Sequence, residues 1–505
     1  MIFLLALLAG AASAFAFQPV AWWPLMILAI AALCEMVWRA ESLKRALLTG
    51  WCFGLGQFVI GLNWIATAFT FQAKMPASLG WVAVVLLSLY LAIYPAMVTG
   101  LAWRFGEKSR VALVLALAGG WAITEWLRAT MFTGLAWNPL AASAVDQIDR
   151  LVPLVGTYGA SSFLVFGYGA CWLLSKREIR PLIVWGVLGL IGSLATGLGP
   201  AKPEQGRSRP IRIIQPNIGQ QDKWRPGFED QSSRRLEVLT IKGPPVTRLI
   251  FWPEAAVTAP LEDGRIAAQR LAEDERLAAT RAMGIGDVLL TGALSLTSHD
   301  GVNVDGATNS VYVLEPLGRI RGRYDKAHLV PYGEYLPMRP LLSAIGLSRL
   351  APGDIDFASG PGPRTIQLPG NWGKAGFQLC YEIIFSGQVV DRNNRPDFIF
   401  NPSNDAWFGR WGPPQHLAQA RLRAAEEALP VIRSTPTGIS ALIDADGKLI
   451  KAIPWQQAGI IDARLPNPGQ PTIFARFGNI IPLALGFMLL IAAIALDRRA
   501  RYRRI

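Results

Sequence analysis

Long apolar runs dominate the first 198 residues of the chain and return once near its C-terminus. Seven runs lie at about 1–17, 20–38, 47–70, 79–103, 111–128, 151–175 and 181–198, and an eighth lies at about 478–496. A helix needs about 20 apolar residues to cross a bilayer. The pattern therefore predicts seven N-terminal transmembrane helices, a large polar block and one C-terminal transmembrane helix.

The links between these runs carry positive charge alternately. The link at 17–19 has none and the link at 71–78 has only Lys74, whereas five arginines follow the eighth run. Basic residues also follow the second, fourth and sixth runs: Arg39, Lys44, Arg45, Arg104, Lys108, Arg110, Lys176, Arg177 and Arg180. Because cytoplasmic loops are enriched in Lys and Arg, both termini are predicted in the cytoplasm and the polar block outside it. Residues 12–16 resemble a signal-peptide cleavage region, but the basic start is missing and cleavage would leave the later topology unchanged.

The polar block, about 200–472, contains short apolar strands interleaved with helices. Strands are predicted at 211–214, 248–252, 287–291, 309–315, 319–324, 374–379, 397–400, 439–444 and 448–453. Helices are predicted at 228–241, at 264–283 and after Pro413-Pro414, which suits a helix start. This alternation indicates a layered α/β domain. We therefore expect three parts: a seven-helix transmembrane region (1–199), an extracytoplasmic catalytic domain (200–472), and a transmembrane helix with a basic tail (473–505).

The bulk composition agrees with a membrane protein that has a large polar part. The chain is 51% hydrophobic and 17% charged, against roughly 25% charged in soluble domains. A net charge of +13 first suggests nucleic acid. However, arginines directly after an apolar run are better explained as topology and lipid-headgroup signals. The three widely spaced histidines offer no metal-ligand cluster, so neither a metal nor a cofactor is expected.

Several polar residues lie within or beside the apolar runs. Gln57, Asn63 and Glu125 do so, and Arg128 follows Glu125 closely. Ionisable groups in membranes are costly and often functional. Alternatively, Glu125 and Arg128 lie at a helix end near the headgroups and pair there. Trp137, like most tryptophans of this part, is predicted to anchor the chain at the interface.

Cys380 is the only cysteine outside the apolar runs, and it directly follows the predicted strand 374–379. Outside the cytoplasm this thiol would have no disulfide partner in the polar block. It is either a small buried hydrophobe or a nucleophile.

Three further polar residues, Glu254, Lys326 and Asn404, also follow predicted strands. Strand ends are where layered α/β folds assemble their sites, so these groups are expected to meet Cys380. A thiol becomes a good nucleophile only as a thiolate and needs a base. Glu254 after a buried strand is one candidate base. His328 and His416 are others, which would make a Cys–His enzyme.

Lys326 is a candidate for stabilising a tetrahedral oxyanion, with Glu334 and Glu382 orienting and balancing its charge. It lies in the stretch Asp325-Lys-Ala-His-Leu-Val-Pro-Tyr-Gly-Glu-Tyr335. The alternative is a lysine that is simply solvated on a loop.

Three motifs together resemble the Glu–Lys–Cys triad of the nitrilase superfamily: Trp252-Pro-Glu254, the stretch 325–335 and Leu379-Cys-Tyr-Glu382. The fuller pattern is similar to a membrane-bound branch, the apolipoprotein N-acyltransferase family, over essentially the whole chain. It is carried by Gln215-Pro-Asn217, Lys223-Trp224, Asn309-Ser310, residues 401–409, residues 412–417 and residues 420–424.

The resemblance implies an αββα sandwich inserted in the helical membrane bundle, and a ping-pong acyl transfer. Glu254 would take the proton of Cys380, whose thiolate attacks a phospholipid ester while Lys326 stabilises the oxyanion. The thioester would then acylate the α-amino group of a diacylglyceryl apolipoprotein. The resemblance further implies that three residues support the active site: Glu334, Tyr381 and Glu382. It implies that five more lie on substrate-facing loops and bind substrate: Trp224, Asn309, Asn404, Trp407 and Phe408.

The same resemblance implies a monomer in the bacterial inner membrane, with phospholipid, apolipoprotein and the bilayer as partners and no nucleic acid. Two other functions are open at this point. A membrane-tethered amidase or nitrilase would use the same triad on small amides. A transporter or receptor with a sensory α/β domain would not need Cys380 at all.

Overall fold

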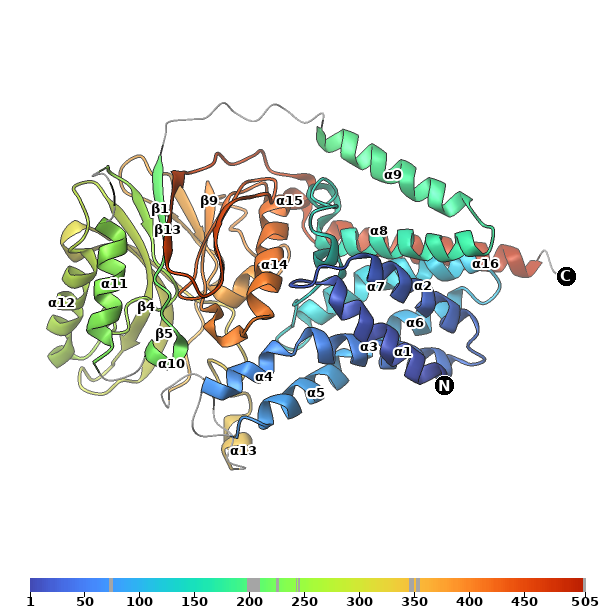
Figure 1. The fold of residues 1–505 in the computed structure, drawn as a ribbon, viewed down its shortest axis with the longest axis horizontal. Coiled ribbons are helices and arrows are strands. Elements are labelled where there is room, and N and C mark those ends of the chain that lie inside the picture. The colour runs from blue at the N-terminus through green and yellow to red at the C-terminus, as the bar shows by residue number, and fades with distance from the viewer. Residues whose placement is uncertain are drawn as a thin grey trace.

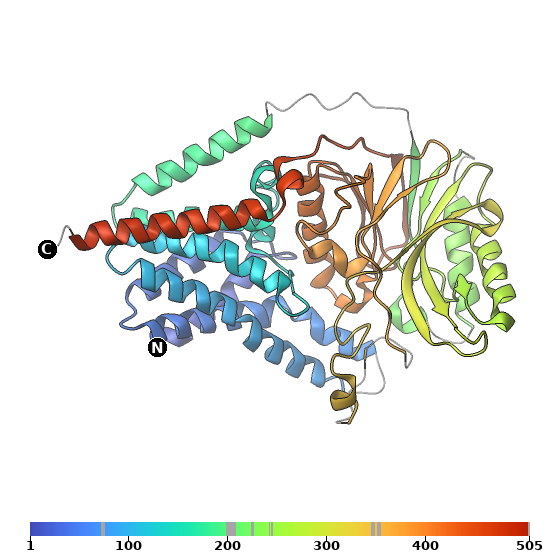
Figure 2. The ribbon, with the colours of Figure 1, turned by 180° about the vertical axis from the view of Figure 1, so that it is seen from behind.

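The computed structural model describes residues 1–71, 76–197, 209–223, 227–241, 243, 246–344, 349–350 and 355–502. A helical bundle and a two-sheet sandwich lie side by side (Figure 1). Both termini lie at the end of the bundle that is away from the sandwich, as the view from behind also shows (Figure 2).

Each predicted apolar run coincides with helix. Ser42 and Ser109 cap the starts of the third and seventh helices through their hydroxyl groups, a role for which serine is well suited. The helices are α1 (Ile2–Ser13), α2 (Pro24–Trp38), α3 (Leu43–Gly61), α4 (Trp64–Ala68), α5 (Leu79–Leu91), α6 (Ile93–Phe105), α7 (Arg110–Thr130), α8 (Val152–Ser175), α9 (Arg180–Gly197) and α16 (Ile480–Tyr502).

Fewer helices meet the length and hydropathy needed to cross a membrane than the number of predicted apolar runs. Among the described residues, three helical stretches are long and apolar enough to cross: Leu79–Phe105, Arg110–Thr130 and Ile480–Tyr502. The run predicted at 47–70 is bent by 42° between α3 and α4, and it makes a fourth span if the pair is one crossing. The count of seven plus one therefore stays a prediction.

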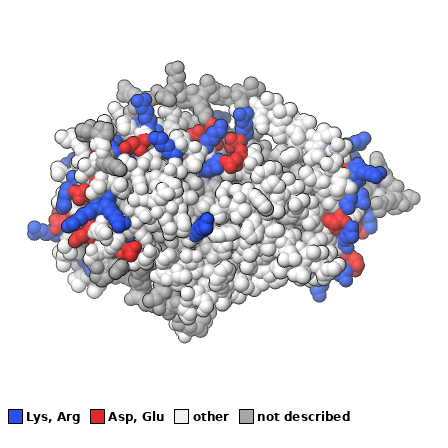
Figure 3. Space-filling view, in the orientation of Figure 1, with Lys and Arg blue, Asp and Glu red and all other residues white. Residues whose placement is uncertain are grey.

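The surface of the helical half separates two charged regions. In Figure 3 charged side chains gather over the sandwich and at the far end of the bundle, and the surface between them is nearly free of charge. A broad uncharged belt of this kind suits contact with hydrocarbon.

Two sheets form the sandwich. The first has the order β13-β1-β2-β4-β5-β6, with β3 beside β4, and the second has the order β12-β11-β10-β9-β8-β7. Parallel neighbours are β1-β2-β4 in the first sheet and β8-β9-β10 in the second. The strands are β1 (Pro210–Gln215), β2 (Leu249–Phe251), β3 (Glu262–Asp263), β4 (Val288–Thr297), β5 (Gly306–Glu315), β6 (Arg319–Asp325), β7 (Thr365–Gln367), β8 (Lys374–Phe377), β9 (Phe398–Pro402), β10 (Val431–Ser434), β11 (Ser440–Ile443), β12 (Leu449–Ile453) and β13 (Gly459–Arg464).

Helices cover both outer faces, which gives the expected αββα order. The helices α11 (Glu229–Ile241) and α12 (Gln269–Thr280) lie on the first sheet, and α14 (Gly412–Glu427) lies between the second sheet and the bundle (Figure 1). Apolar side chains from both sheets, such as Phe251, Phe377 and Phe400, fill the space between them. Sequence patterns missed β3, β7 and β10, which have two to four residues, and also β13, which has six.

A buried charged pair joins the sandwich to the bundle. Glu426 on α14 accepts the backbone N–H of Thr157 on α8 at 2.7 Å and lies 2.8 Å from Arg423. Arg423 also donates to the carbonyl oxygen of Ile384 at 3.1 Å. The short helix α15 (Ile473–Phe477) packs beside the same stretch of α8.

Gly156 allows this close packing, and substituting it tests the junction. Its φ is +69° inside α8, and an added Cβ would lie 2.2 Å from the Phe474 ring of α15. We expect G156A to lower the unfolding temperature of the purified protein, since overpacking typically costs about 1–3 kcal/mol. In α9, the added Cβ of G186A meets no atom within 4 Å, so this matched variant should not lower it. Equal unfolding temperatures for the two variants would contradict this account of the junction.

Candidate active site

Three strand ends place Glu254, Lys326 and Cys380 in one buried region. Glu254 follows β2, Lys326 follows β6, and Cys380 comes shortly after β8. The Lys326 Nζ lies 3.7 Å from the Glu254 Oε1. The exposed fractions are 6%, 1% and 5% for the three residues, so charge on any of them needs a partner nearby.

Lys326 is paired with two carboxylates. Its Nζ donates to the Glu334 Oε1 at 2.9 Å, in addition to the contact with Glu254. Burial alone would lower the pKa of Lys326, but Glu334, Glu254 and Cys380 together raise it above its ordinary value. The lysine is therefore a permanent cation in the site.

Asn309 joins the same two carboxylates. Its Nδ2 donates to the Glu254 Oε1 at 2.8 Å and to the Glu334 Oε1 at 3.0 Å. The resemblance implies a substrate-facing loop position for Asn309, but this residue lies buried on β5. It fixes the spacing of the carboxylates around Lys326.

Glu254 keeps one oxygen available. Its Oε1 is occupied by Asn309, whereas its buried Oε2 has no hydrogen-bond partner among the described residues. A buried carboxylate oxygen that lacks a donor is suited to accept a proton. Glu254 thus has the chemistry expected of a general base.

Cys380 begins a tight turn, with φ +48° and a 3₁₀ helix over Cys380–Ile384. Positive φ is uncommon for a residue with a side chain and marks a strained position. Burial and then Glu254 raise the pKa of the thiol, while Lys326 and the backbone N–H of Asn404 oppose the rise. The group therefore rests as a thiol and needs a base to become a nucleophile.

Glu382 ties the turn to the Lys326 loop. Its carboxylate accepts the backbone N–H groups of Leu379 (2.7 Å), Ala327 (2.8 Å) and His328 (3.0 Å), and the Tyr324 hydroxyl (2.9 Å). It acts on the backbone beside Lys326, and Glu334 is the group that contacts the ammonium itself. Glu382 is therefore a positioning residue.

The two histidines near the site are engaged elsewhere. The His416 Nε2–H donates to the Cys380 carbonyl oxygen at 3.0 Å, and its Nδ1 lies 3.0 Å from both Asp405 and Arg433. The His328 Nε2–H donates to the Thr133 carbonyl at 2.8 Å. Burial lowers the pKa of both rings. With His416 fully engaged, the structure favours Glu254 over a Cys–His pair.

The remaining predicted residues divide between the site and the bundle. The Asn404 Nδ2 donates to the Gln220 Oε1 at 2.9 Å beside Cys380. Phe408 packs between Trp64 (4.6 Å between ring centroids) and Trp137 (5.4 Å), and Trp407 contacts Phe71 (5.7 Å).

Tyr381 also faces the bundle, because its hydroxyl donates to the Gly134 carbonyl at 3.0 Å. Trp224 lies outside the described residues. Phe408 and Tyr381 thus belong to the junction with the bundle.

Sequence patterns missed two groups at the site. Arg433 on β10 donates to both oxygens of Asp405, at 2.7 and 2.6 Å, beneath His416. Lys223 is buried with its Nζ 3.5 Å from the Glu254 carbonyl oxygen, and burial lowers the pKa of Lys223 to about 8. An arginine in an apolar strand was the available signal for the first, and the Lys223-Trp224 motif for the second.

Family models of known proteins match both the helical part and the sandwich part of the chain. The family model for the apolipoprotein N-acyltransferase N-terminal domain matches residues 9–170, and the carbon-nitrogen hydrolase model matches residues 232–470.

Curated relatives cover nearly the whole chain. The apolipoprotein N-acyltransferase of Rhodopseudomonas palustris is 32% identical, over 98% of this chain and 95% of its own. The enzyme of that name from Bradyrhizobium diazoefficiens is 33% identical, over 99% and 95%. The one from Rhizobium rhizogenes is 33% identical, over 92% and 89%.

Removing the positive charge of Lys326 and removing the negative charge of Glu254 should shift the pKa of the Cys380 thiol in opposite directions. K326M removes the nearby cation that lowers the pKa of Cys380, so alkylation by iodoacetamide should shift to higher pH. E254Q removes a negative charge that raises this pKa, so alkylation should shift to lower pH. Mass spectrometry of peptide 374–395 against pH measures both. Shifts of the same sign would contradict the assigned geometry, and the C380A protein shows how much of the label on this peptide is not on Cys380.

Proposed function

The chain belongs to the apolipoprotein N-acyltransferase family, and we propose that it acylates lipoproteins through a thioester on Cys380. The observation that supports this proposal most is the buried charge arrangement at the strand ends. Lys326 stays a cation between Glu254 and Glu334, while the Glu254 Oε2 has no donor among the described residues. A base, a cation and a thiol in one buried region are the groups that a nucleophilic acyl transfer needs.

The first half-reaction moves an acyl group from phospholipid to sulfur. Glu254 takes the thiol proton, and the Cys380 thiolate attacks the ester carbonyl carbon. Lys326 stabilises the oxyanion of the tetrahedral intermediate. The attack forms the C–S bond. Collapse of the intermediate then restores the C=O bond and breaks the ester C–O bond, and the leaving lysophospholipid oxygen takes the proton from Glu254.

The second half-reaction moves the acyl group to nitrogen. The free α-amino group of the diacylglyceryl-cysteine attacks the thioester carbonyl and gives a proton to Glu254. The attack forms the C–N bond. Collapse of the tetrahedral intermediate restores the C=O bond and breaks the C–S bond, and Glu254 returns a proton to the Cys380 sulfur. The lysophospholipid leaves before the apolipoprotein reacts, so the kinetics are ping-pong.

The protein is a membrane protein, and we propose how it is oriented. Residues 200–472 form the catalytic domain on the periplasmic side of the inner membrane, between the helices of 1–199 and of 473–505. The alternating basic links support this orientation. It is also supported by the position of both termini at the end of the bundle away from the sandwich (Figure 1).

A membrane-tethered amidase with the same triad is the main alternative. The triad geometry alone does not distinguish the two reactions, because both begin with attack by Cys380 on a carbonyl carbon. The match of residues 9–170 to the acyltransferase N-terminal domain favours acyl transfer to lipoprotein.

Acyl transfer through Cys380 predicts a detectable covalent intermediate. Incubating the purified protein with phospholipid alone should add the mass of one acyl chain to the peptide that carries Cys380. Adding a diacylglyceryl peptide should remove this mass and yield N-acyl peptide. We expect C380S to lose at least about 100-fold of the transfer rate, because hydroxyl is a far weaker nucleophile than thiolate. Release of free fatty acid without N-acyl peptide would favour a hydrolase instead.

The proposed orientation predicts which introduced cysteines an impermeant reagent can label from outside the cytoplasm. A cysteine at Val302, which is 70% exposed on the sandwich, should react with an impermeant maleimide once the outer membrane is opened. A cysteine at Glu41, exposed in the link between α2 and α3, should react only after lysis. Labelling of the Glu41 position in unlysed cells, with the Val302 position protected, would reverse the topology.

A further inference from the structure

One loop between α7 and α8 touches the site and the bundle together. We call residues 131–140 the junction loop. On the sandwich side, Tyr381 donates to the Gly134 carbonyl at 3.0 Å and His328 donates to the Thr133 carbonyl at 2.8 Å. Tyr381 is adjacent to Cys380, and His328 lies two residues from Lys326. The junction loop therefore accepts hydrogen bonds from two side chains that lie close in sequence to Cys380 and to Lys326.

Two charged residues of α7 hold the same loop from the bundle side. The Arg128 Nη1 donates to the Trp137 carbonyl at 2.8 Å. The Glu125 Oε1 accepts the backbone N–H of Leu140 at 2.7 Å and the Trp121 indole N–H at 2.9 Å.

Ser161 on α8 extends this set of hydrogen bonds. Its hydroxyl accepts the backbone N–H of Ala141, the residue after the junction loop, at 2.9 Å. Glu125 and Ser161 together accept three N–H donors, from Trp121, Leu140 and Ala141, and Arg128 donates to the loop from the same side.

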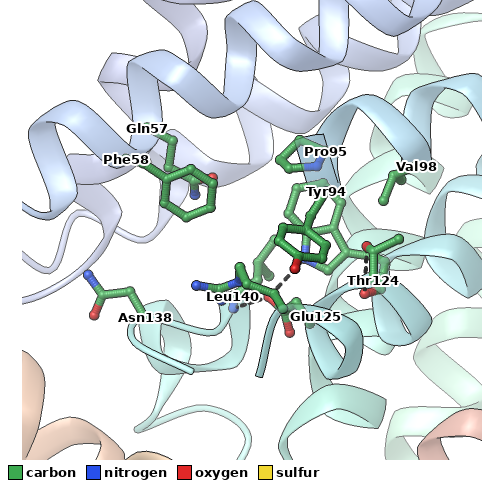
Figure 4. Close-up of a pocket in the computed structure, with 11 residues that line it drawn as sticks. Gln57, Phe58, Tyr94, Pro95, Val98, Thr124, Glu125, Asn138 and Leu140 are labelled. Atoms are coloured by element: carbon green, nitrogen blue, oxygen red, sulfur yellow. Dashed lines mark hydrogen bonds between the residues drawn. The ribbon is translucent and has the colours of Figure 1, made fainter. Parts of the chain in front are cut away.

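Both charged side chains are buried, with exposed fractions of 6% for Glu125 and 4% for Arg128. They line a small polar cavity of about 20 Å³ together with Gln57, Tyr94 and Asn138 (Figure 4). Two atoms on its walls, the Glu125 Oε2 and the Asn138 Oδ1, have no hydrogen-bond partner among the described residues. The cavity has room for about one water molecule, which suits these atoms.

Glu125 and Arg128 do lie near the end of α7, as one of the two expectations had it, but both are buried against the junction loop and hydrogen-bond its backbone. Trp137, expected at the interface, is fully buried and donates to Gln415 of α14 at 2.8 Å. Buried charge inside a membrane bundle is expensive. Packing alone would not require it here, so its contacts with the loop backbone are the better explanation.

We propose that Glu125 and Arg128 are positioning residues for the acyl-transfer site, acting through the junction loop on Tyr381 and His328. This inference rests on the proposed role of Cys380 and Lys326. The loop transmits position because it is closely packed: a Cβ at Gly134, which has φ +72°, would lie 2.1 Å from the Ala129 carbonyl oxygen. Loosening its bundle-side bonds shifts the two acceptor carbonyls, and misplacement of about 1 Å lowers rates about 100-fold.

Conservative and apolar variants of the two residues separate positioning from charge. E125Q keeps the oxygen that accepts the Leu140 N–H, whereas E125L removes it. S161A and S162A form a second pair on adjacent residues of α8. Ser161 bonds the Ala141 N–H, but Ser162 donates to the Ala118 carbonyl of α7 at 2.8 Å, away from the loop.

The full-length protein in lipid nanodiscs is assayed for acyl-Cys380 formation with phospholipid, at saturating and limiting concentrations. The pH profile of Cys380 alkylation and the unfolding temperature are measured in parallel. We expect E125L and R128M to lower the maximal acylation rate by about tenfold or more and to shift the alkylation profile. S161A should lower the acylation rate less than E125L and R128M do. E125Q should stay within about threefold of the unaltered protein, and S162A should match it.

The proposal is overturned if E125L and S161A change the rate and the alkylation profile no more than S162A does. It is also overturned if a folded E125Q is as slow as E125L, since the charge itself would then be required. Failure of the proposed function has a different signature: the unaltered protein would acylate peptide without any adduct on Cys380, or C380S would retain the rate.

Discussion

The charge on Lys326 is the constraint on which the site depends. Its side chain is 1% exposed, and a buried ammonium without partners would lose its proton or fail to stay buried. Glu254 and Glu334, from separate parts of the chain, keep it charged, and neither of these carboxylates is tolerable there without it. Because Asn309 on β5 bridges the two, the ends of β2, β5 and β6 are held to one geometry.

The nucleophile turn depends on a second buried set. Cys380 adopts φ +48°, a conformation that persists only where the surroundings fix it. Glu382 fixes the turn through backbone donors, and His416 holds the Cys380 carbonyl above the Asp405–Arg433 pair. Removing one partner of such a buried pair costs about 3–5 kcal/mol. The strained backbone at Cys380 is thus maintained by polar contacts from side chains other than Glu254 and Lys326.

Sequence patterns could locate the helices and the candidate site residues, but not which way individual side chains face. Apolar runs of 17 to 25 residues located the helices, and polar residues after strands located Glu254, Lys326 and Cys380. The short central strand β10 was missed because Val431–Ser434 has only two apolar residues before Arg433. Whether Tyr381 and Phe408 face a substrate or the bundle depends on Gly134, Trp64 and Trp137, which are more than 200 residues away in the chain.

The junction between the sandwich and the bundle limits how far the two parts can move apart during a reaction on lipid. A membrane-tethered enzyme with a loosely hinged domain would have to find the bilayer again for each lipid substrate. Here Glu426 and Arg423 join α14 to α8 inside a buried junction, and Arg423 reaches the carbonyl at the end of the catalytic 3₁₀ helix. The turn that carries Cys380 is thereby tied to the bundle through α14, so the site that we propose for both half-reactions lies next to the helical part of the chain. The buried polar groups of the bundle fit this arrangement. Glu125 and Arg128 hydrogen-bond the backbone of the junction loop, and such bonds offset part of the free-energy cost of burying their charges.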